Sequence, residues 1–193
     1  MDTGPLFCLG ASTLIAELYD SHYRDDAVVV AAVKHEVQRN AERRVPPGDP
    51  ARKGFVTQAA KASQRRYALL LARAVPRPEP TPQALTDIEA HLLQLALNKS
   101  RNGRVHPDAN RGEAESLYEA EFHGTTLIAN EDDAVRVAKA RRNAPVENFV
   151  DVVRRLRHER HTVSPQQLVN ELTRLTRQGI DIGDTVTGVT DLV

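Results

Sequence analysis

Two kinds of apolar pattern alternate along the chain. Continuous apolar runs at residues 27–30 and 125–129 predict short strands buried on both faces, because such strands have no side that must face water. Apolar residues spaced three or four positions apart predict helices over residues 31–44, 55–73, 81–97, 112–122, 131–142, 146–160 and 164–177. Strands that are each followed by a helix indicate an α/β domain with a central, mostly parallel sheet.

The two ends of the chain add further elements. Asp2 stands at the end of a very short first strand, and the Gly4-Pro5 pair turns the chain into a helix. Ser164 and Pro165 open the last long helix, Gly179 ends it, and an irregular or extended tail follows. At 193 residues the chain is long enough for one sizeable core. We expect one domain at residues 1–145 and a helical C-terminal extension at residues 146–193 packed on the same domain.

Composition narrows the class of protein. Charged residues make up 27% of the chain and tryptophan is absent, so the core must consist mainly of Leu, Val, Ile and Ala. The single cysteine, Cys8, excludes an internal disulfide and fits a reducing compartment, which predicts a cytoplasmic protein. The apolar stretch at residues 5–16 is too short and too interrupted to span a bilayer or to act as a signal peptide.

Charge is balanced overall but uneven along the chain. The formal net charge is zero, which argues against binding of nucleic acid by bulk charge alone. Residues 34–73 nevertheless carry ten Lys or Arg and only three acids, whereas residues 113–133 carry seven acids and no Lys or Arg. A solvated helix face or ordinary capping of a helix dipole by Glu113 and Glu115 would explain such acids. Their position near predicted strand ends favours a metal site instead, because ligands of open α/β sheets bind there.

Four short motifs occur in order along the chain. They are Asp2-Thr3 at the end of the first strand, Glu36 on the helix after Val28-Val29-Val30, Gly112-Glu113-Ala114-Glu115 at a helix start, and Glu131-Asp132 after Leu127-Ile128. Together they resemble a PIN domain, the fold of many small metal-dependent ribonucleases that include the VapC-type toxins of toxin–antitoxin pairs. The resemblance covers most of the chain and implies a three-layer fold, with helices on both faces of a central sheet.

The resemblance also implies roles for individual residues. The first three acids of the family fall on Asp2, Glu36 and Glu113, and the fourth falls on Glu131 or Asp132. It implies catalytic roles for Asp2, Glu36, Glu113 and Asp132, and metal ligation by Asp2, Glu113, Glu131 and Asp132. Supporting positions are Thr3, which matches the hydroxyl residue after the first acid, Glu115, and Asn130, which stands where the family often has Ser or Thr.

The chemistry of these side chains agrees with a metal site. Magnesium and manganese prefer oxygen ligands, and a few carboxylates leave coordination positions open for water and a phosphate oxygen. Glu113 and Glu115 are two positions apart, or about 200° around a helix, so they cannot both face one ion. We therefore expect Glu113 to be the ligand.

The expected activity is that of a Mg²⁺ or Mn²⁺ dependent endoribonuclease, a hydrolase of phosphodiester bonds in RNA with an accessible single-stranded segment. Candidate phosphate contacts are Arg43, Arg44, Arg65 and Arg66. The toxin interpretation adds a small antitoxin as partner and leaves a homodimer open. Two alternatives remain, a catalytically weak PIN-like module for nucleic-acid binding or interaction, and a structure-specific DNA nuclease.

Overall fold

A computed structural model describes residues 1–46, 48–100, 105, 110–159 and 163–192. Its elements in chain order are α1 (Thr3–Ala11), α2 (Thr13–Tyr23), α3 (Ala31–Glu42), α4 (Ala51–Arg66), α5 (Ala68–Ala72), α6 (Gln83–Lys99), α7 (Arg111–His123), β1 (Leu127–Ile128), α8 (Asp132–Arg141), β2 (Val146–Glu147), α9 (Phe149–Glu159), α10 (Pro165–Arg177) and the 3₁₀ turn η1 (Val189–Leu192). Helices therefore dominate the described chain.

The expected three-layer α/β fold is wrong. The structure is mostly helical, and the described residues contain only one sheet, in which β1 and β2 pair in parallel over two residues each. The apolar run at residues 27–30 forms an isolated bridge, Val30 to Val75, rather than a full strand. The physical reason is length, because a helix begins directly after each run, at Ala31 and at Asp132. Extended stretches of two to four residues cannot repeat the pairing that builds a central sheet.

The short extended segments nevertheless lie in one hydrogen-bonded row. Val75 N donates to Val29 O at 2.9 Å, and Met1 N donates to Val28 O at 2.7 Å. Asp2 N then donates to Ile128 O at 2.9 Å, and β1 pairs with β2 on its other side. We call this arrangement the extended row. Its importance is positional, because α1, α3 and α8 all start where a segment of the row ends.

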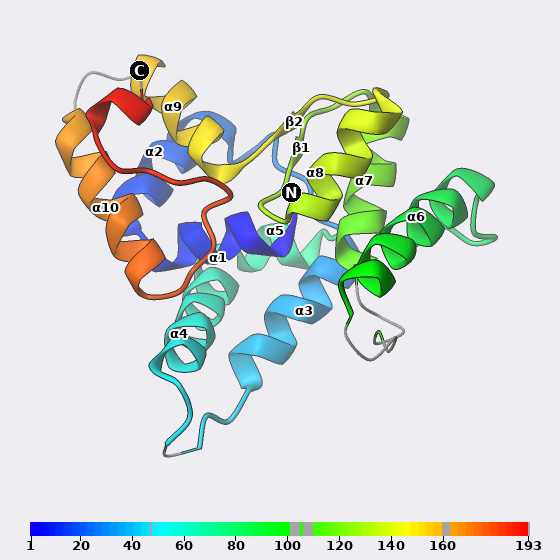
Figure 1. Cartoon of the computed structure of the whole chain (residues 1–193), viewed down its shortest axis with the longest axis horizontal. Helices are drawn as coiled ribbons and strands as arrows, with labels where there is room; N and C mark the ends of the chain where they lie inside the picture. The colour runs from blue at the N-terminus through cyan, green and yellow to red at the C-terminus, as the bar shows by residue number, and fades with distance from the viewer. Residues whose placement is uncertain (47, 101–104, 106–109, 160–162, 193) are drawn as a thin grey trace.

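Two buried clusters flank the extended row. Figure 1 shows α1, α2, α9 and α10 gathered on one side and α6, α7 and α8 on the other. The larger cluster joins apolar side chains of α1 to α4 with those of α9, α10 and the C-terminal tail, and the smaller one joins α6, α7, α8 and β1. Leu, Val, Ile and Ala supply most of both clusters. The helices at residues 146–177 thus share a core with the N-terminal helices.

Several helix boundaries follow directly from local sequence. Ser164 and Gln167 form a reciprocal capping box before α10, with Pro165 in the first turn. Gly124 ends α7 with a φ of 62°, a left-handed conformation that favours glycine. Among the described residues, no helix combines the length and the apolar character needed to cross a bilayer.

Candidate functional site

Four carboxylates from separate helices lie near one another beside the extended row. Asp2 is the N-cap residue of α1 and only 3% exposed, and Glu36 lies in the second turn of α3. The Thr3 hydroxyl donates a hydrogen bond of 2.8 Å to Glu36 Oε2 and joins the two helices. Glu113 in the first turn of α7 and Glu131 before α8 complete the group, which we call the carboxylate cluster.

Gly112 allows α7 to approach the first two acids. A Cβ atom at this position would lie 3.6 Å from Asp2 Oδ1, 3.6 Å from Glu36 Oε2 and 3.3 Å from Val33 Cγ2. The carboxylates of α1 and α3 therefore both reach the backbone of the first turn of α7. The first turn of α7, which carries Glu113, is therefore packed closely against Asp2 and Glu36.

Among the described residues, Glu113 forms no hydrogen bond or ion pair with a basic side chain, and its immediate electrostatic neighbours are acids. Its Oε2 atom is buried and accepts no hydrogen bond from the described residues. Burial raises the pKa of Glu113 to about 9, and the charges of Asp2, Glu131, Glu36 and Asp133 add to the effect in that order. After desolvation, the main influences on this carboxyl are thus other acids.

The pKa values of Asp2 and Glu131 are raised as well. Burial raises the pKa of Asp2 to about 7, and the charge of Glu36 contributes next, against a hydrogen bond from the Thr3 backbone. Desolvation also raises the pKa of Glu131, followed by the charges of Asp181 and Glu36. The charge of Glu36 thus acts on Asp2, Glu113 and Glu131, and the charges of Asp2 and Glu131 act on Glu113.

The remaining acids around α8 differ in their surroundings. Glu131 and Asp132 are both exposed at the start of α8, and Asp133 forms an ion pair with Lys99 at 2.9 Å. Of the two candidates for the fourth acid, Glu131 is the one whose charge raises the pKa of Glu113. This charge effect, and not a difference in exposure, favours Glu131 over Asp132.

Glu115 has a different environment from the cluster. It is 2% exposed and accepts hydrogen bonds from Arg111 Nε at 2.9 Å, Arg77 Nη1 at 3.3 Å and Ala32 N at 3.3 Å. The last contact caps the first turn of α3. Glu115 therefore serves as a structural acid that ties α7 to α3, and it faces away from Glu113 as the helical spacing predicts.

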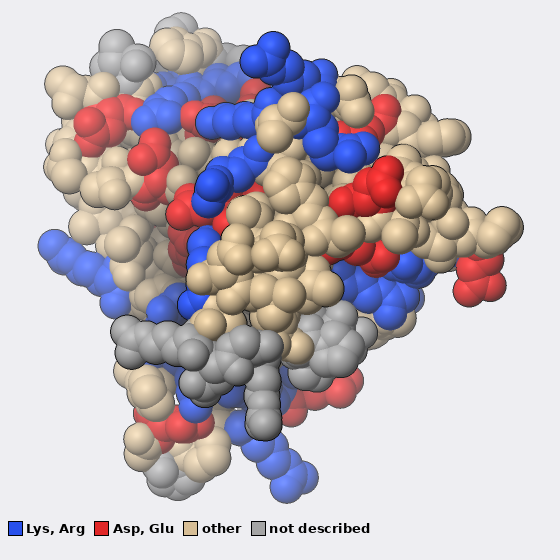
Figure 2. Space-filling view, turned by 45° about the vertical axis from the view of Figure 1, so that its right-hand side comes forward, with Lys and Arg blue, Asp and Glu red and all other residues tan. Residues whose placement is uncertain are grey.

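The four predicted arginine contacts do not form one patch. Arg43 and Arg44 are exposed just after α3, whereas Arg65 and Arg66 end α4, which is about 24 Å long for its 16 residues. Arg66 is already paired with Asp20 at 2.8 Å. Figure 2 shows Lys and Arg along the upper edge of one face with acidic side chains among them, so that surface carries both signs.

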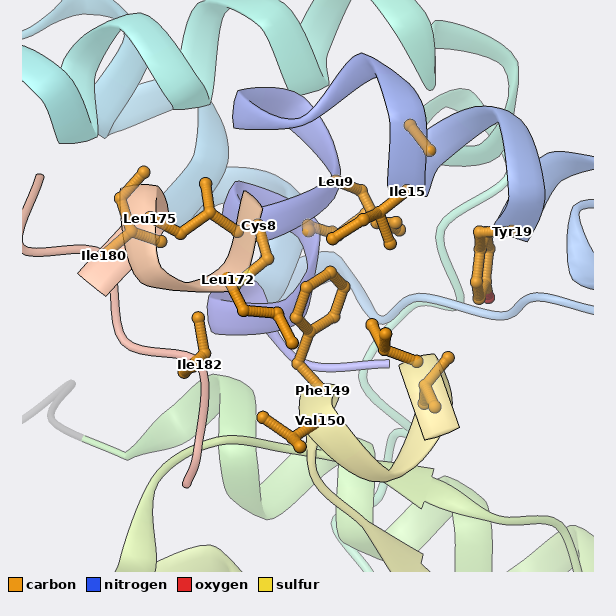
Figure 3. Packing of buried hydrophobic residues seen from close by; sticks show 14 of the residues in the cluster. Cys8, Leu9, Ile15, Tyr19, Phe149, Val150, Leu172, Leu175, Ile180 and Ile182 are labelled. Carbon is orange, nitrogen blue, oxygen red and sulfur yellow. The ribbon is translucent and has the colours of Figure 1, made fainter. Parts of the chain in front are cut away.

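Asn130 anchors the segment that carries Glu131. Its side-chain nitrogen donates to Asp181 O at 2.6 Å and lies 3.6 Å from Cys8 Sγ, while its oxygen accepts from Phe149 N at 3.0 Å. Figure 3 shows Cys8, Phe149 and Ile182 among the side chains of the larger buried cluster. Asn130 therefore positions the backbone of the site. Burial raises the pKa of the neighbouring Cys8 thiol, so this thiol stays protonated.

Asp181 is a site residue that sequence reasoning did not identify. It lies in the C-terminal tail between the buried Ile180 and Ile182, and its charge is the largest electrostatic influence on Glu131. The alternation of apolar and acidic residues at 180–182 was the available signal, because it predicts a segment with one buried side and one exposed acid.

The side chains of the carboxylate cluster are of the chemical type that binds cations through oxygen. Carboxylates with surplus negative charge, and one buried oxygen without a donor, are the chemistry that Mg²⁺ and Mn²⁺ neutralise. As the side chains stand, no three His, Cys, Asp or Glu of the described residues are arranged to hold one ion. Metal binding would require the carboxylates to rotate toward a common point.

Comparisons with known proteins gave no match to this chain among models of protein families, curated proteins or solved structures. The functional argument therefore rests on the geometry and charge of the carboxylate cluster.

Proposed function

We propose that this protein is a divalent-cation-dependent endoribonuclease that hydrolyses phosphodiester bonds. The observation that carries the proposal is the half-buried Glu113 side chain, whose buried Oε2 accepts no hydrogen bond from the described residues and whose main electrostatic neighbours are four acids. A structural acid would be expected to have a basic partner, as Glu115 has. An uncompensated group of acids is instead suited to a cation that arrives with its substrate.

Each residue has a distinct part in this proposal. Asp2, Glu113 and Glu131 supply oxygen ligands, with Asp132 at the rim. Glu36, whose Oε2 is held by the Thr3 hydroxyl, is oriented to accept a proton from an attacking water. A bound Mg²⁺ or Mn²⁺ would activate water and neutralise charge on the scissile phosphate.

The substrate surface lies along α3. His35, Arg39 and Arg43 recur every fourth residue along α3 and just after it, and they line a hollow of ≈ 630 Å³. Two arginines and a histidine at this spacing suit the phosphates of a nucleic-acid backbone. RNA with a single-stranded or looped segment would lie along α3 with one phosphate next to the cluster. Arg43 is thus retained from the predicted contacts, and Arg39 is added.

Cleavage of a mixed RNA pool tests the proposal. We expect products with Mg²⁺ or Mn²⁺ and none in excess EDTA, with loss of cleavage in Glu113→Gln and retention in the matched variant Glu115→Gln. Equal cleavage in EDTA would exclude the cation. Cleavage of a single-stranded DNA pool and not of RNA would favour the alternative DNA nuclease.

The substrate surface has its own test. Arg39→Glu with Arg43→Glu should weaken RNA binding and flatten its salt dependence, because each lost phosphate contact removes counterion release. Arg65→Glu is the matched control at the far end of α4 and should leave the slope unchanged. Equal slopes in all three proteins would remove α3 from the RNA surface.

The PIN resemblance also supports a partner. We propose a small antitoxin protein that covers the carboxylate cluster and stops cleavage. Co-expression with the product of a short neighbouring reading frame should suppress the RNase activity of the purified complex, and full activity of a stable complex would contradict this.

A further inference from the structure

The charges of α8 are divided between its two ends. Its charged residues, in chain order from the N-cap to the C-cap, are Glu131, Asp132, Asp133, Arg136, Lys139, Arg141 and Arg142. Asp133 is paired with Lys99 at 2.9 Å, and Arg141 is paired with Glu121 at 2.6 Å. The other two acids lie at the carboxylate cluster. The other three bases are exposed and form no ion pair with any described residue.

The electrostatics of an isolated helix explains only part of this pattern. Cations in a last turn interact favourably with the helix dipole, which accounts for Lys139 and for Arg142 at the C-cap. Arg136 lies one turn earlier and four residues after Asp132, a spacing that favours an ion pair, and the two form none. Asp132, Arg136 and Lys139 follow one another at i, i+4 and i+7. They therefore share one face of α8, which leads from the carboxylate cluster to the far end of the helix.

The cations of α3 and those of α8 lie on opposite sides of the carboxylate cluster. Gly112 packs against Glu36, whereas Glu115, farther along α7, contacts the backbone of Ala32. Helices α7 and α3 thus run antiparallel where they meet. Helix α8 runs in the direction of α7, because both start at the cluster and an ion pair joins their last turns. Figure 1 shows α3 in the lower part of the molecule and α7 and α8 at the upper right.

We propose that one RNA strand crosses the carboxylate cluster, with α3 binding it on one side of the scissile phosphate and Arg136, Lys139 and Arg142 binding it on the other. This inference rests on the proposed nuclease function and adds the second half of its substrate surface. Residues 36–43 and 131–142 together extend at most about 27 Å, at about 1.5 Å per residue. A stacked strand covers this length with about eight nucleotides at roughly 3.4 Å each. The substrate is thus a single strand that is cut internally.

The first experiment measures binding of a fluorescent twelve-nucleotide uridine RNA to the whole chain in EDTA, so that no cleavage interferes. Arg136→Gln with Lys139→Gln should weaken binding by about tenfold at low salt and reduce the salt slope by about 1.4, because two phosphate contacts are lost. Lys61→Gln with Arg65→Gln is the matched control, since it removes the same charge from exposed positions of α4, and its slope should equal that of the wild type. An unchanged slope in the α8 variant would overturn the inference.

A variant of α3 separates failure of this inference from failure of the proposed function. Arg39→Gln with Arg43→Gln should flatten the slope by the same amount as the α8 variant. If the α3 variant flattens the slope and the α8 variant does not, only the second half of the surface is wrong. Absence of salt-dependent RNA binding by the wild type would overturn the nuclease proposal and this inference together.

Stoichiometry tests whether one strand uses both helices. One twelve-nucleotide RNA should bind per protein, and the α3 and α8 substitutions combined should reduce the slope by about 2.8, because four different phosphates lose their contacts. Two RNA molecules per protein would identify separate sites and overturn the continuous strand. With Mg²⁺, an end-labelled RNA should be cut by the wild type only away from both ends. Equally frequent cuts next to an end would also overturn it.

Discussion

Glu113 and Glu115 are two residues apart on one helix and have opposite environments. Glu115 is almost fully buried, and two arginines and a backbone amide satisfy its carboxylate. Glu113 has a buried oxygen with no donor among the described residues, and other acids surround it. The local sequence of the two is nearly the same, so the difference comes from what other helices bring to each face of α7.

The contrast separates structural acids from acids held ready for a ligand. Buried charge is tolerated when arginine compensates it, and removal of one partner then leaves an unpaired charge. A buried charge without a partner lowers the stability of the folded protein. Such a charge is expected at a site where a bound cation neutralises it. The following predictions test whether Glu113 and Glu115 differ in this way.

The largest expected effect is on cleavage. Glu113→Gln should lower Mg²⁺-dependent RNA cleavage by about 100-fold or more, in the range found for groups that act directly in a reaction. Glu115→Gln should stay within about threefold of the wild type when rates are corrected for the folded fraction. Single-turnover assays on one RNA decide this, and a similar loss in both variants would remove the distinction.

The second prediction concerns stability. Here Glu115→Gln, and not Glu113→Gln, should be the damaging change. Glu115→Gln should lower the free energy of unfolding by about 2 kcal/mol, because it weakens charged hydrogen bonds to Arg77 and Arg111. Glu113→Gln should raise it at pH 8 in EDTA, because the folded wild type must hold a proton on this carboxyl that the unfolded chain releases, and Gln has no such cost. Urea unfolding of the three proteins measures both changes, and a destabilised Glu113→Gln would contradict the assignment.

The third prediction concerns pH. Asp2 has a pKa of about 7 in the folded protein against an ordinary value of 3.8, so the folded state holds a proton that the unfolded state releases between these values. The contribution of Asp2 to stability is therefore complete below pH 3.8 and is lost as pH rises toward 7. In EDTA, Asp2→Asn should become increasingly more stable than the wild type over this range.

Melts with Mg²⁺ provide the control for Asp2. The stabilisation that Mg²⁺ gives the wild type should shrink in Asp2→Asn, because the ion binds only the folded state and would lose a ligand. An unchanged Mg²⁺-dependent shift would show that Asp2 is not a ligand.

The smallest expected effect is at Thr3. Thr3→Val keeps the shape and removes the hydrogen bond to Glu36 Oε2, which should cost about 1 kcal/mol of stability. If Thr3 orients Glu36, the cleavage rate should fall by more than the loss of folded protein explains. The ratio of the two losses, compared with Thr3→Ser as a conservative rescue, distinguishes orientation from packing.

Local signals predicted much of the helical structure. The helix-start residues Ser164 and Pro165, the helix-ending Gly179 and apolar spacing gave elements close to α3, α7, α8 and α10. The sheet was overpredicted because a β-branched run such as residues 27–30 has strand propensity wherever it occurs, while tertiary context decides how far pairing extends. Propensity alone could not show that a helix takes over at Ala31.

The site was only partly accessible from the sequence. Motif order suggested which acids to examine, and helical spacing separated Glu113 from Glu115. The partners of Glu115 and the approach of Asp181 could not be predicted, because Arg77 and the tail are brought in by long-range packing that no local pattern encodes.

The contact between Asn130 and the Asp181 carbonyl has a consequence for folding of the protein. The carboxylate cluster joins Asp2 to a Glu131 segment that the distant Asp181 carbonyl fixes. Contacts of such long sequence separation form late, because a large loop must close first. A partly folded chain would therefore carry the acids without their final arrangement, so the proposed nuclease would gain activity only in the last steps of folding.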